Sequence, residues 1–131
     1  LTPKGTTYRV LAVGSDEEVI KVERAIKTLY SSKLYATRSL HNFCEILSPD
    51  AGKEKALNWL CQQMNIHPSE VVAFGNGLND LEMIKWAGRG VAIEGGEPEA
   101  LAISSETAPP VQQDGVAIYL SKLLGRNLIR G

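Results

Sequence analysis

The sequence has few aromatic residues, few cysteines and no excess of charge of one sign. Aromatic residues make up 6% of the 131 positions, and the two cysteines, Cys44 and Cys61, are not in a C-x-x-C arrangement. Fourteen basic residues stand against fifteen acidic ones, so the formal charge of -1 offers no broad surface for nucleic acid or anionic lipid. No apolar run approaches the roughly 18 residues of a membrane helix, and no secretory pattern opens the chain. We expect a cytoplasmic protein with no nucleic-acid or membrane partner, and buried, reduced cysteines.

The first half of the chain reads as strand, helix, strand, strand. Residues 8–13 favour a strand, and Ser15 followed by Glu18 matches a capping box at the start of a helix. Residues 34–38 and 43–47 are short strand candidates separated by the sequence SLHN, which is typical of a hairpin. We therefore expect one amphipathic helix followed by a β-hairpin.

The sequence pattern changes at residues 48–52, SPDAG, which is a turn-forming stretch. We place a boundary between two structural units there. Leu57, Leu60, Cys61 and Met64 recur at helical spacing and predict a helix. Apolar strands then alternate with helices, which indicates an α/β fold with a parallel sheet covered on both faces. The predicted elements are a strand at 71–74, a loop at 75–80, a helix at 81–87, a strand at 90–93, a helix at 98–103 and a last helix capped by Asp114.

The loop at residues 75–80 is the strongest candidate for a functional site, because open α/β sheets bind ligands at the carboxyl ends of their strands. Gly75 and Gly77 allow a tight turn. Asn76, Asn79 and Asp80 supply oxygen atoms that suit a hard cation such as magnesium, which would in turn hold a phosphate. The same composition also suits an ordinary loop in which Asn79 or Asp80 caps the next helix, and spacing alone does not separate the two interpretations.

A dinucleotide-binding fingerprint starting at Gly75 and Gly77, with Glu94 as the ribose ligand, is a poor alternative. Its third glycine position is occupied by Asp80, whose charge would face the pyrophosphate. The following helix is also too short for the usual crossover. The fingerprint therefore does not explain the loop.

Lys53 lies in the first turn of the helix after residues 48–52, so its ammonium group can project toward the same loop. A lysine in that place can neutralise charge on a phosphoryl group. By itself, beside Glu54 and Lys55, it is typical of a solvated helix residue. Only its combination with the later loop singles it out.

Together these motifs resemble the haloacid dehalogenase (HAD) superfamily, Cof-type phosphatase subfamily, from about residue 8 to the C-terminus. Gly52-Lys53 is similar to the family's lysine motif, residues 73–83 (AFGNGLNDLEM) to its metal motif, and residues 114–117 (DGVA) to the start of its last helix. The resemblance implies that residues 1–47 are the C-terminal part of an α/β cap domain. It implies that residues 48–131 are the second half of a Rossmann-like parallel-sheet core.

The reaction that the resemblance implies is Mg²⁺-dependent hydrolysis of a small phosphate monoester through an aspartyl-phosphate. Asn76 stands where the family's metal motif normally has an aspartate, so we expect weakened magnesium binding. The resemblance carries over three sets of roles: catalytic, Lys53; metal, Asn76 and Asp80; phosphate and site positioning, Asn79, Gly75 and Gly77.

The family's D-x-D motif, which supplies the aspartyl nucleophile, has no match in these 131 residues. We therefore expect a fragment of a phosphatase that is inactive alone and that takes a small phosphorylated metabolite once its site is completed. The alternative is a non-catalytic binding or interaction module derived from such an enzyme. In either case the sheet edge at residues 71–74 should be covered, by self-association or by the missing N-terminal half.

Overall fold

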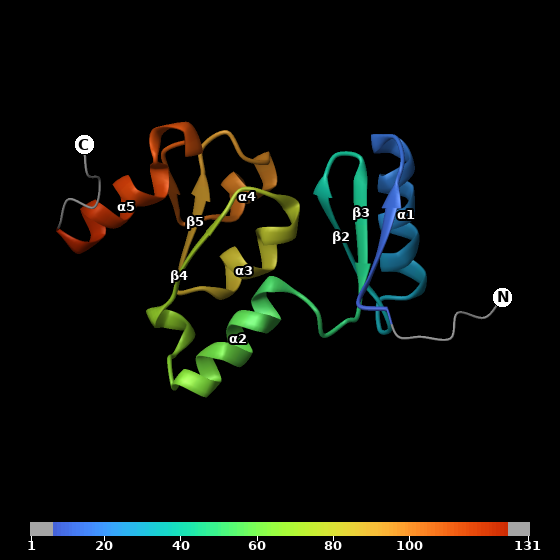
Figure 1. Ribbon diagram of the computed structural model, residues 1–131, viewed down its shortest axis with the longest axis horizontal. Helices are drawn as coiled ribbons and strands as arrows, with labels where there is room; N and C mark the ends of the chain where they lie inside the picture. The colour runs from blue at the N-terminus through green and yellow to red at the C-terminus, as the bar shows by residue number, and fades with distance from the viewer. Residues whose placement is uncertain (1–6, 126–131) are drawn as a thin grey trace.

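The computed structural model describes residues 7–125 as two α/β units connected through residues 48–52 (Figure 1). The first unit contains β1 (Arg9–Val13), α1 (Asp16–Leu29), β2 (Tyr35–Leu40) and β3 (Phe43–Leu47). The second contains α2 (Lys53–Met64), β4 (Val72–Gly75), α3 (Leu81–Trp86), β5 (Arg89–Ile93), α4 (Pro98–Ile103), β6 (Glu106–Ala108) and α5 (Gly115–Leu124), with short 3-10 helices η1 (Pro68–Glu70), η2 (Leu78–Asp80) and η3 (Val111–Gln113). The predicted α/β class is confirmed, whereas the assignment of 1–47 as cap and 48–131 as core stays a prediction whose two ends lie outside the described residues.

The first unit is an antiparallel sheet of three strands, in the order β1-β3-β2, with α1 packed on one face. The predicted capping box at the start of α1 is present, because Ser15 and Glu18 exchange side-chain and backbone hydrogen bonds. The buried centre is small and consists of Val19, Ala36 and Cys44. Burial, followed by the negative charge of Glu23, raises the pKa of the Cys44 thiol, as expected for a buried reduced cysteine.

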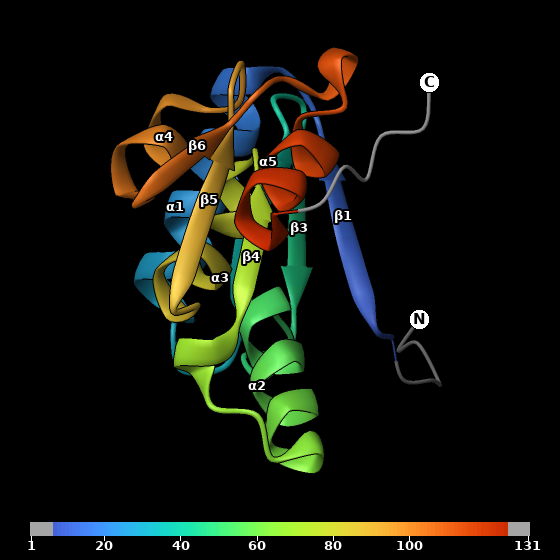
Figure 2. The same ribbon diagram turned by 90° about the vertical axis from the view of Figure 1, so that its left-hand side faces the viewer.

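The second unit is a parallel sheet of three strands in the order β4-β5-β6. Helices α3 and α4 lie on the face nearer the first unit and α5 lies on the opposite face, so the expectation of a sheet covered on both faces is confirmed (Figures 1 and 2). Phe74 of β4 meets Tyr119 of α5 edge to face, with ring centroids 5.3 Å apart. This contact packs α5 against β4, the strand that leads to the candidate loop.

Strand β4 is an edge strand in the part of the chain that the structure describes, because only β5 pairs with it. Helix α2 contacts α3 and leaves much of its predicted apolar stripe exposed: Cys61 is buried, but Leu60 and Met64 are not, and Trp59 beside them is 62% exposed. Within residues 7–125 no helix is both long and apolar enough to cross a membrane. The second unit therefore presents an unpaired sheet edge and exposed apolar side chains.

Three details differ from the sequence-based expectations. Ser39 and Leu40 belong to β2 rather than to the hairpin loop, which shortens the turn to His41 and Asn42. Strand β6 was not expected, because its three residues carry little apolar character and it forms by pairing with β5. Asp114 does stand at the start of α5, but its side chain makes no capping hydrogen bond, because the residue is left-handed (φ 54°) where η3 ends.

Candidate functional site

The carboxylate of Asp80 organises the loop that follows β4. Its side chain folds back along the loop, and one oxygen, Oδ2, accepts hydrogen bonds from the backbone N–H groups of Asn76 (2.9 Å) and Gly77 (3.0 Å). Asp80 is only 3% exposed. It does not cap α3, but its bond to the Gly77 N–H caps the start of η2, the 3-10 helix that leads into α3. The expected capping role of Asp80 is therefore present in part, and the loop is also wound around this buried carboxylate.

Lys53 supplies the positive partner of this carboxylate. Its ammonium group contacts Oδ1 of Asp80, the oxygen that the backbone N–H groups leave open. Lys53 is the first residue of α2, so the linker between the two units delivers it to the loop. Its side chain remains 50% exposed, so the loop does not enclose the lysine as it encloses Asp80. The fold therefore brings Lys53 to the later loop, as the sequence predicted.

Gly75 is required by the close approach of Asp80. A Cβ atom at position 75 would lie 2.5 Å from Cβ of Asp80 and 3.0 Å from Cδ1 of Ile84, which is closer than packed carbon atoms tolerate. Gly77 has a φ of -120°, a value open to other residues, and its N–H is one of the two that bind Asp80. Gly75 therefore has a steric role and Gly77 a hydrogen-bonding one.

The two asparagines lie beside this carboxylate without contacting it through their side chains. Asn76 is exposed and uses its backbone N–H, whereas Asn79 is half-buried and lines a small cavity together with Lys53. These residues offer the type of oxygen ligand that Mg²⁺ prefers, but they offer too few of them to fill its coordination shell. Both oxygens of Asp80 are engaged, and the described residues contain no group of three or more His, Cys, Asp or Glu placed to hold a metal. A bound Mg²⁺ would need ligands from outside residues 7–125.

The first unit reaches the candidate site through Tyr35 of β2. Its hydroxyl donates a hydrogen bond to Oε2 of Glu82 in the first turn of α3, at 3.3 Å. Burial, followed by the negative charge of Glu82, raises the pKa of Tyr35, so the phenol stays protonated and keeps this donor role over the neutral range. Tyr35 and Glu82 line the same small cavity as Lys53 and Asn79. The two units therefore meet beside the lysine.

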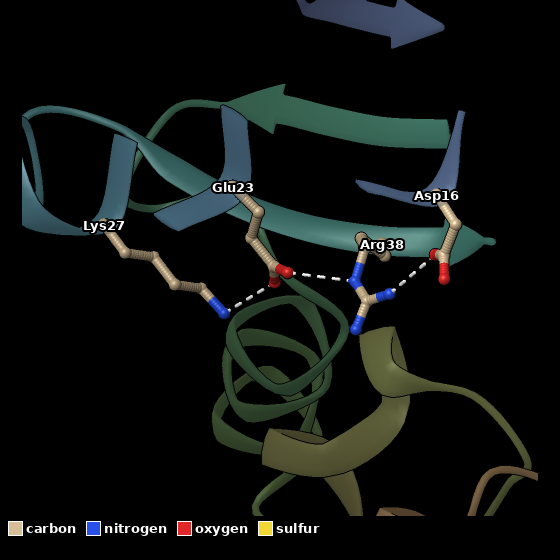
Figure 3. Close-up of polar contacts among 4 residues, drawn as sticks. All are labelled: Asp16, Glu23, Lys27 and Arg38. Atoms are coloured by element: carbon tan, nitrogen blue, oxygen red, sulfur yellow. Dashed lines mark hydrogen bonds and ion pairs between the residues drawn. The ribbon is translucent and has the colours of Figure 1, made fainter. Parts of the chain in front are cut away.

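A second charged cluster, which the sequence analysis did not identify, lies in the first unit around Arg38 (Figure 3). Its Nε donates to Glu23 at 3.0 Å and its Nη1 to Asp16 at 3.3 Å, while Lys27 binds Glu23 at 2.7 Å. Arg38 also lines a cavity with Leu78, which belongs to the loop after β4. The only signal in the sequence was the spacing of Glu23 and Lys27, because the Arg38 contacts depend on β2 folding beside α1.

Comparison with known proteins places these features in a family. Residues 2–120 match the family model of haloacid dehalogenase-like hydrolases. A phosphoglycolate phosphatase of Methanopyrus kandleri is 31% identical over 93% of this chain and 53% of its own length. The 5-amino-6-(5-phospho-D-ribitylamino)uracil phosphatase of Escherichia coli is 28% identical over 84% of this chain and 41% of its own length.

The fold is shared with solved structures as well. A haloacid dehalogenase-like hydrolase from Bacillus subtilis superposes with a TM-score of 0.84 at 26% identity, over 93% of this chain and 43% of that one. The chain thus spans about half the length of the relatives it matches. Its family match, its parallel sheet and its loop around Asp80 agree, and the chain belongs to the haloacid dehalogenase-like hydrolase family.

Proposed function

We propose that this chain is the supporting part of a phosphatase that hydrolyses small phosphate monoesters. The observation that carries the proposal is the contact between Lys53 and the buried Asp80, at the carboxyl end of β4. Two backbone N–H groups hold the carboxylate, so its position is fixed before any ligand arrives. Such a site places a positive charge, rather than a nucleophile, beside a bound phosphoryl group.

The chemistry assigned to this chain is charge stabilisation. Phosphoryl transfer needs positioning and neutralisation of the equatorial oxygens more than it needs covalent groups from every part of the site. Lys53, whose side chain is half exposed, would bind a phosphoryl oxygen, and Asp80 would hold the lysine in place. When bound, Mg²⁺ would polarise the phosphoryl group, with Asn76 and Asp80 as this chain's neighbours to it. The aspartyl nucleophile would come from outside these 131 residues, as no D-x-D motif occurs in them.

The named relatives support a small phosphorylated substrate. The proteins from Methanopyrus kandleri and Escherichia coli are both named as phosphatases of small phosphate monoesters. Their substrates differ widely in the part that is not phosphate. The relatives therefore support the class of reaction for this chain but not a particular substrate.

The partner we propose is a segment that carries the missing nucleophile and pairs with β4. The edge of β4 is unpaired within residues 7–125, and the exposed side chains of Trp59, Leu60 and Met64 lie on the neighbouring α2. Proteins seldom leave such an edge and such apolar side chains bare. Self-association is the other way to cover them, and sedimentation distinguishes a 14.2 kDa monomer from a dimer.

The proposal is tested by completing the site. The isolated chain should not hydrolyse p-nitrophenyl phosphate with magnesium at neutral pH. Mixing or fusing it with a family N-terminal half that carries D-x-D should restore magnesium-dependent turnover, and Asn76→Asp should tighten magnesium binding in the completed protein. Turnover by the isolated chain that requires Asp80 or Lys53 would contradict the proposal, and so would a completed, folded protein without activity.

The second candidate function is a non-catalytic module that binds a ligand or partner. Asn76 favours it, because a neutral amide occupies the position where the family motif normally carries a carboxylate. A completed protein that folds, stays inactive and shows the same magnesium affinity after Asn76→Asp would establish the module in place of the enzyme.

A further inference from the structure

A cleft of about 510 Å³ lies between α5 and the strands β5 and β6 of the second unit. We call it the Arg89 cleft. Its lining combines charged and polar side chains with apolar ones: Arg89, Glu106, Tyr119 and Lys122, together with Pro109 and Leu123. Its volume falls in the range of cavities that bind small organic molecules.

The charged part of the Arg89 cleft lies away from the proposed phosphate site. Arg89 and Glu106 are the first residues of β5 and β6, which run parallel to β4, whereas the candidate loop follows Gly75, the last residue of β4. Arg89 pairs with Val72, so it lies about 10 Å along the strands from the start of that loop. In the sheet, β6 is the edge strand opposite β4, and the cleft shares no lining residue with the cavity beside Lys53. The cleft is therefore a separate site.

The cations of the cleft outnumber its carboxylates. Glu106 is the one acidic residue in the lining, and both of its oxygens are engaged: Oε1 lies 3.4 Å from Nε of Arg89, and Oε2 accepts a hydrogen bond from Tyr119 at 2.9 Å. Lys122 makes no ion pair within residues 7–125. The positive charges of Arg89 and Lys122 therefore face the single negative charge of Glu106, which leaves one positive charge in excess.

Arg89 can receive a second carboxylate without giving up its place in the fold. The side chains of Arg89 and Glu106 are 43% and 44% exposed, and an ion pair this open to water contributes little stability. The guanidinium has five N–H donors, so part of this donor set can turn toward an incoming anion. Tyr119, in contrast, is buried and holds Glu106 in place. Leu123 follows Tyr119 by four residues on α5, so the two side chains form one wall of the cleft.

We infer that the Arg89 cleft binds a small organic carboxylate with an apolar body. The one positive charge in excess matches one carboxylate, whereas a phosphate monoester carries close to two negative charges at neutral pH. Arg89 and Lys122 bind the carboxylate, and Pro109, Leu123 and the ring of Tyr119 contact the apolar body. The inference is independent of the proposed function, because it uses no residue of the phosphate site.

Binding of benzoate to the full chain tests the inference, with the backbone amide shifts followed by NMR at constant ionic strength. Benzyl alcohol has the same ring without the charge and is the comparison ligand. We expect benzoate to cause saturable shifts at residues 119–123, and benzyl alcohol to bind at least about tenfold more weakly.

Lys122→Met should weaken benzoate binding about fivefold, because it removes one of two cations and keeps a chain of similar length. The matched control is Lys85→Met, which changes an exposed lysine of α3 that does not line the cleft. It should change the affinity by less than about twofold.

Glu106→Gln should change the affinity in the opposite direction. It removes the charge that repels an incoming carboxylate and keeps an oxygen that accepts from the Tyr119 hydroxyl. We expect benzoate to bind about threefold more tightly. A gain in affinity does not arise from partial unfolding, so this variant keeps the test decisive even where another variant folds poorly.

Several results would overturn the inference: no saturable shifts at residues 119–123, equal affinities for benzoate and benzyl alcohol, equal effects of Lys122→Met and Lys85→Met, or weaker binding in Glu106→Gln. Shifts confined to residues 76–80 would place the anion beside Lys53. That result would overturn the inference while supporting the proposed phosphate site.

Discussion

The two charged clusters of the molecule hold their carboxylates in different ways. In the second unit, the Asp80 carboxylate is buried, and both backbone N–H groups and a lysine side chain bind it. In the first unit, Glu23 and Asp16 are bound by the side chains of Arg38 and Lys27, and Asp16 remains more than half exposed. Backbone donors cannot move without refolding the loop, whereas side-chain donors can rotate. The Asp80 cluster is therefore the more rigid and the costlier to break.

The difference matches the role proposed for the Asp80 cluster. A group that receives the phosphoryl charge must be placed before the ligand binds, and the loop around Asp80 provides this placement. The mutations below rank the two clusters by the stability that each contributes.

The largest effect is expected from Asp80→Ala. Removing the carboxylate leaves two backbone N–H groups and the Lys53 ammonium without their acceptor in a buried loop. We expect a loss of about 3 kcal/mol in the free energy of unfolding, measured by urea denaturation. Asp50→Ala, in the turn between the units, is the control for loss of an acidic residue. A loss below about 1 kcal/mol for Asp80→Ala would mean that the loop does not depend on its carboxylate.

Gly75→Ala is expected to have the next largest effect, because it disturbs the same carboxylate without removing it. The added Cβ would lie 2.5 Å from Cβ of Asp80, so the Asp80 side chain or the loop must shift. We expect a loss of about 2 kcal/mol in thermal or urea unfolding. Gly52→Ala is the matched control, since a Cβ there meets no atom closer than 3.7 Å. Equal effects of the two substitutions would show that Asp80 is not tightly packed.

Arg38→Gln probes the first unit in the same way. It removes the partner of Glu23, whose side chain is only 14% exposed, and of Asp16, which faces solvent. We expect a loss of about 1 kcal/mol, smaller than for Asp80→Ala because Lys27 still binds Glu23 and water reaches Asp16. Arg24→Gln, an exposed residue of α1, is the control. A loss as large as that for Asp80→Ala would reverse the ranking of the two clusters.

The smallest effect concerns Glu18, an exposed carboxylate held only by the capping box. Hydrogen bonds from the backbone and then the side chain of Ser15 lower the pKa of Glu18 below its ordinary value of 4.5. A lowered pKa in the folded state means that the stabilisation is present above pH 4.5 and is lost as the pH falls below it. Glu18→Gln should flatten the acid limb of a plot of stability against pH, whereas Ser15→Ala should flatten it less, because the backbone N–H of residue 15 remains as a donor. Ser31→Ala should leave the acid limb unchanged. An unchanged acid limb in Glu18→Gln would show that the capping box does not titrate.

Much of the fold could be predicted because its signals are local. The capping box at Ser15 and Glu18 lies within one turn of helix, and the predicted helix at residues 98–103 matches α4. Strand β6 could not be predicted in this way, since residues 106–108 become a strand only by pairing with β5. The left-handed conformation of Asp114 was missed because η3 and α5 meet at that residue.

The residues of the candidate site likewise separate into those with a local sequence signal and those without one. Gly75, Asn76 and Asp80 are close in sequence, so the loop could be identified before its geometry was known. Lys53 lies 27 positions before Asp80, and its place in the first turn of a helix predicted that it projects toward the loop but not that it contacts this carboxylate. Arg38 was missed altogether, because its partners are 15 and 22 positions away and meet it only when β2 packs beside α1. Contacts between distant elements need the fold itself.

The central claim, that Lys53 and its buried partner form the charge-stabilising part of a phosphatase site, is tested most directly by one comparison of kcat/KM. In the protein completed with a D-x-D-bearing half, Lys53→Met should lower kcat/KM for p-nitrophenyl phosphate by about 100-fold or more. Lys55→Met, two positions along the same helix and without a contact to Asp80, should stay within about twofold of the unsubstituted protein. Equal kcat/KM values for the two variants would contradict the account.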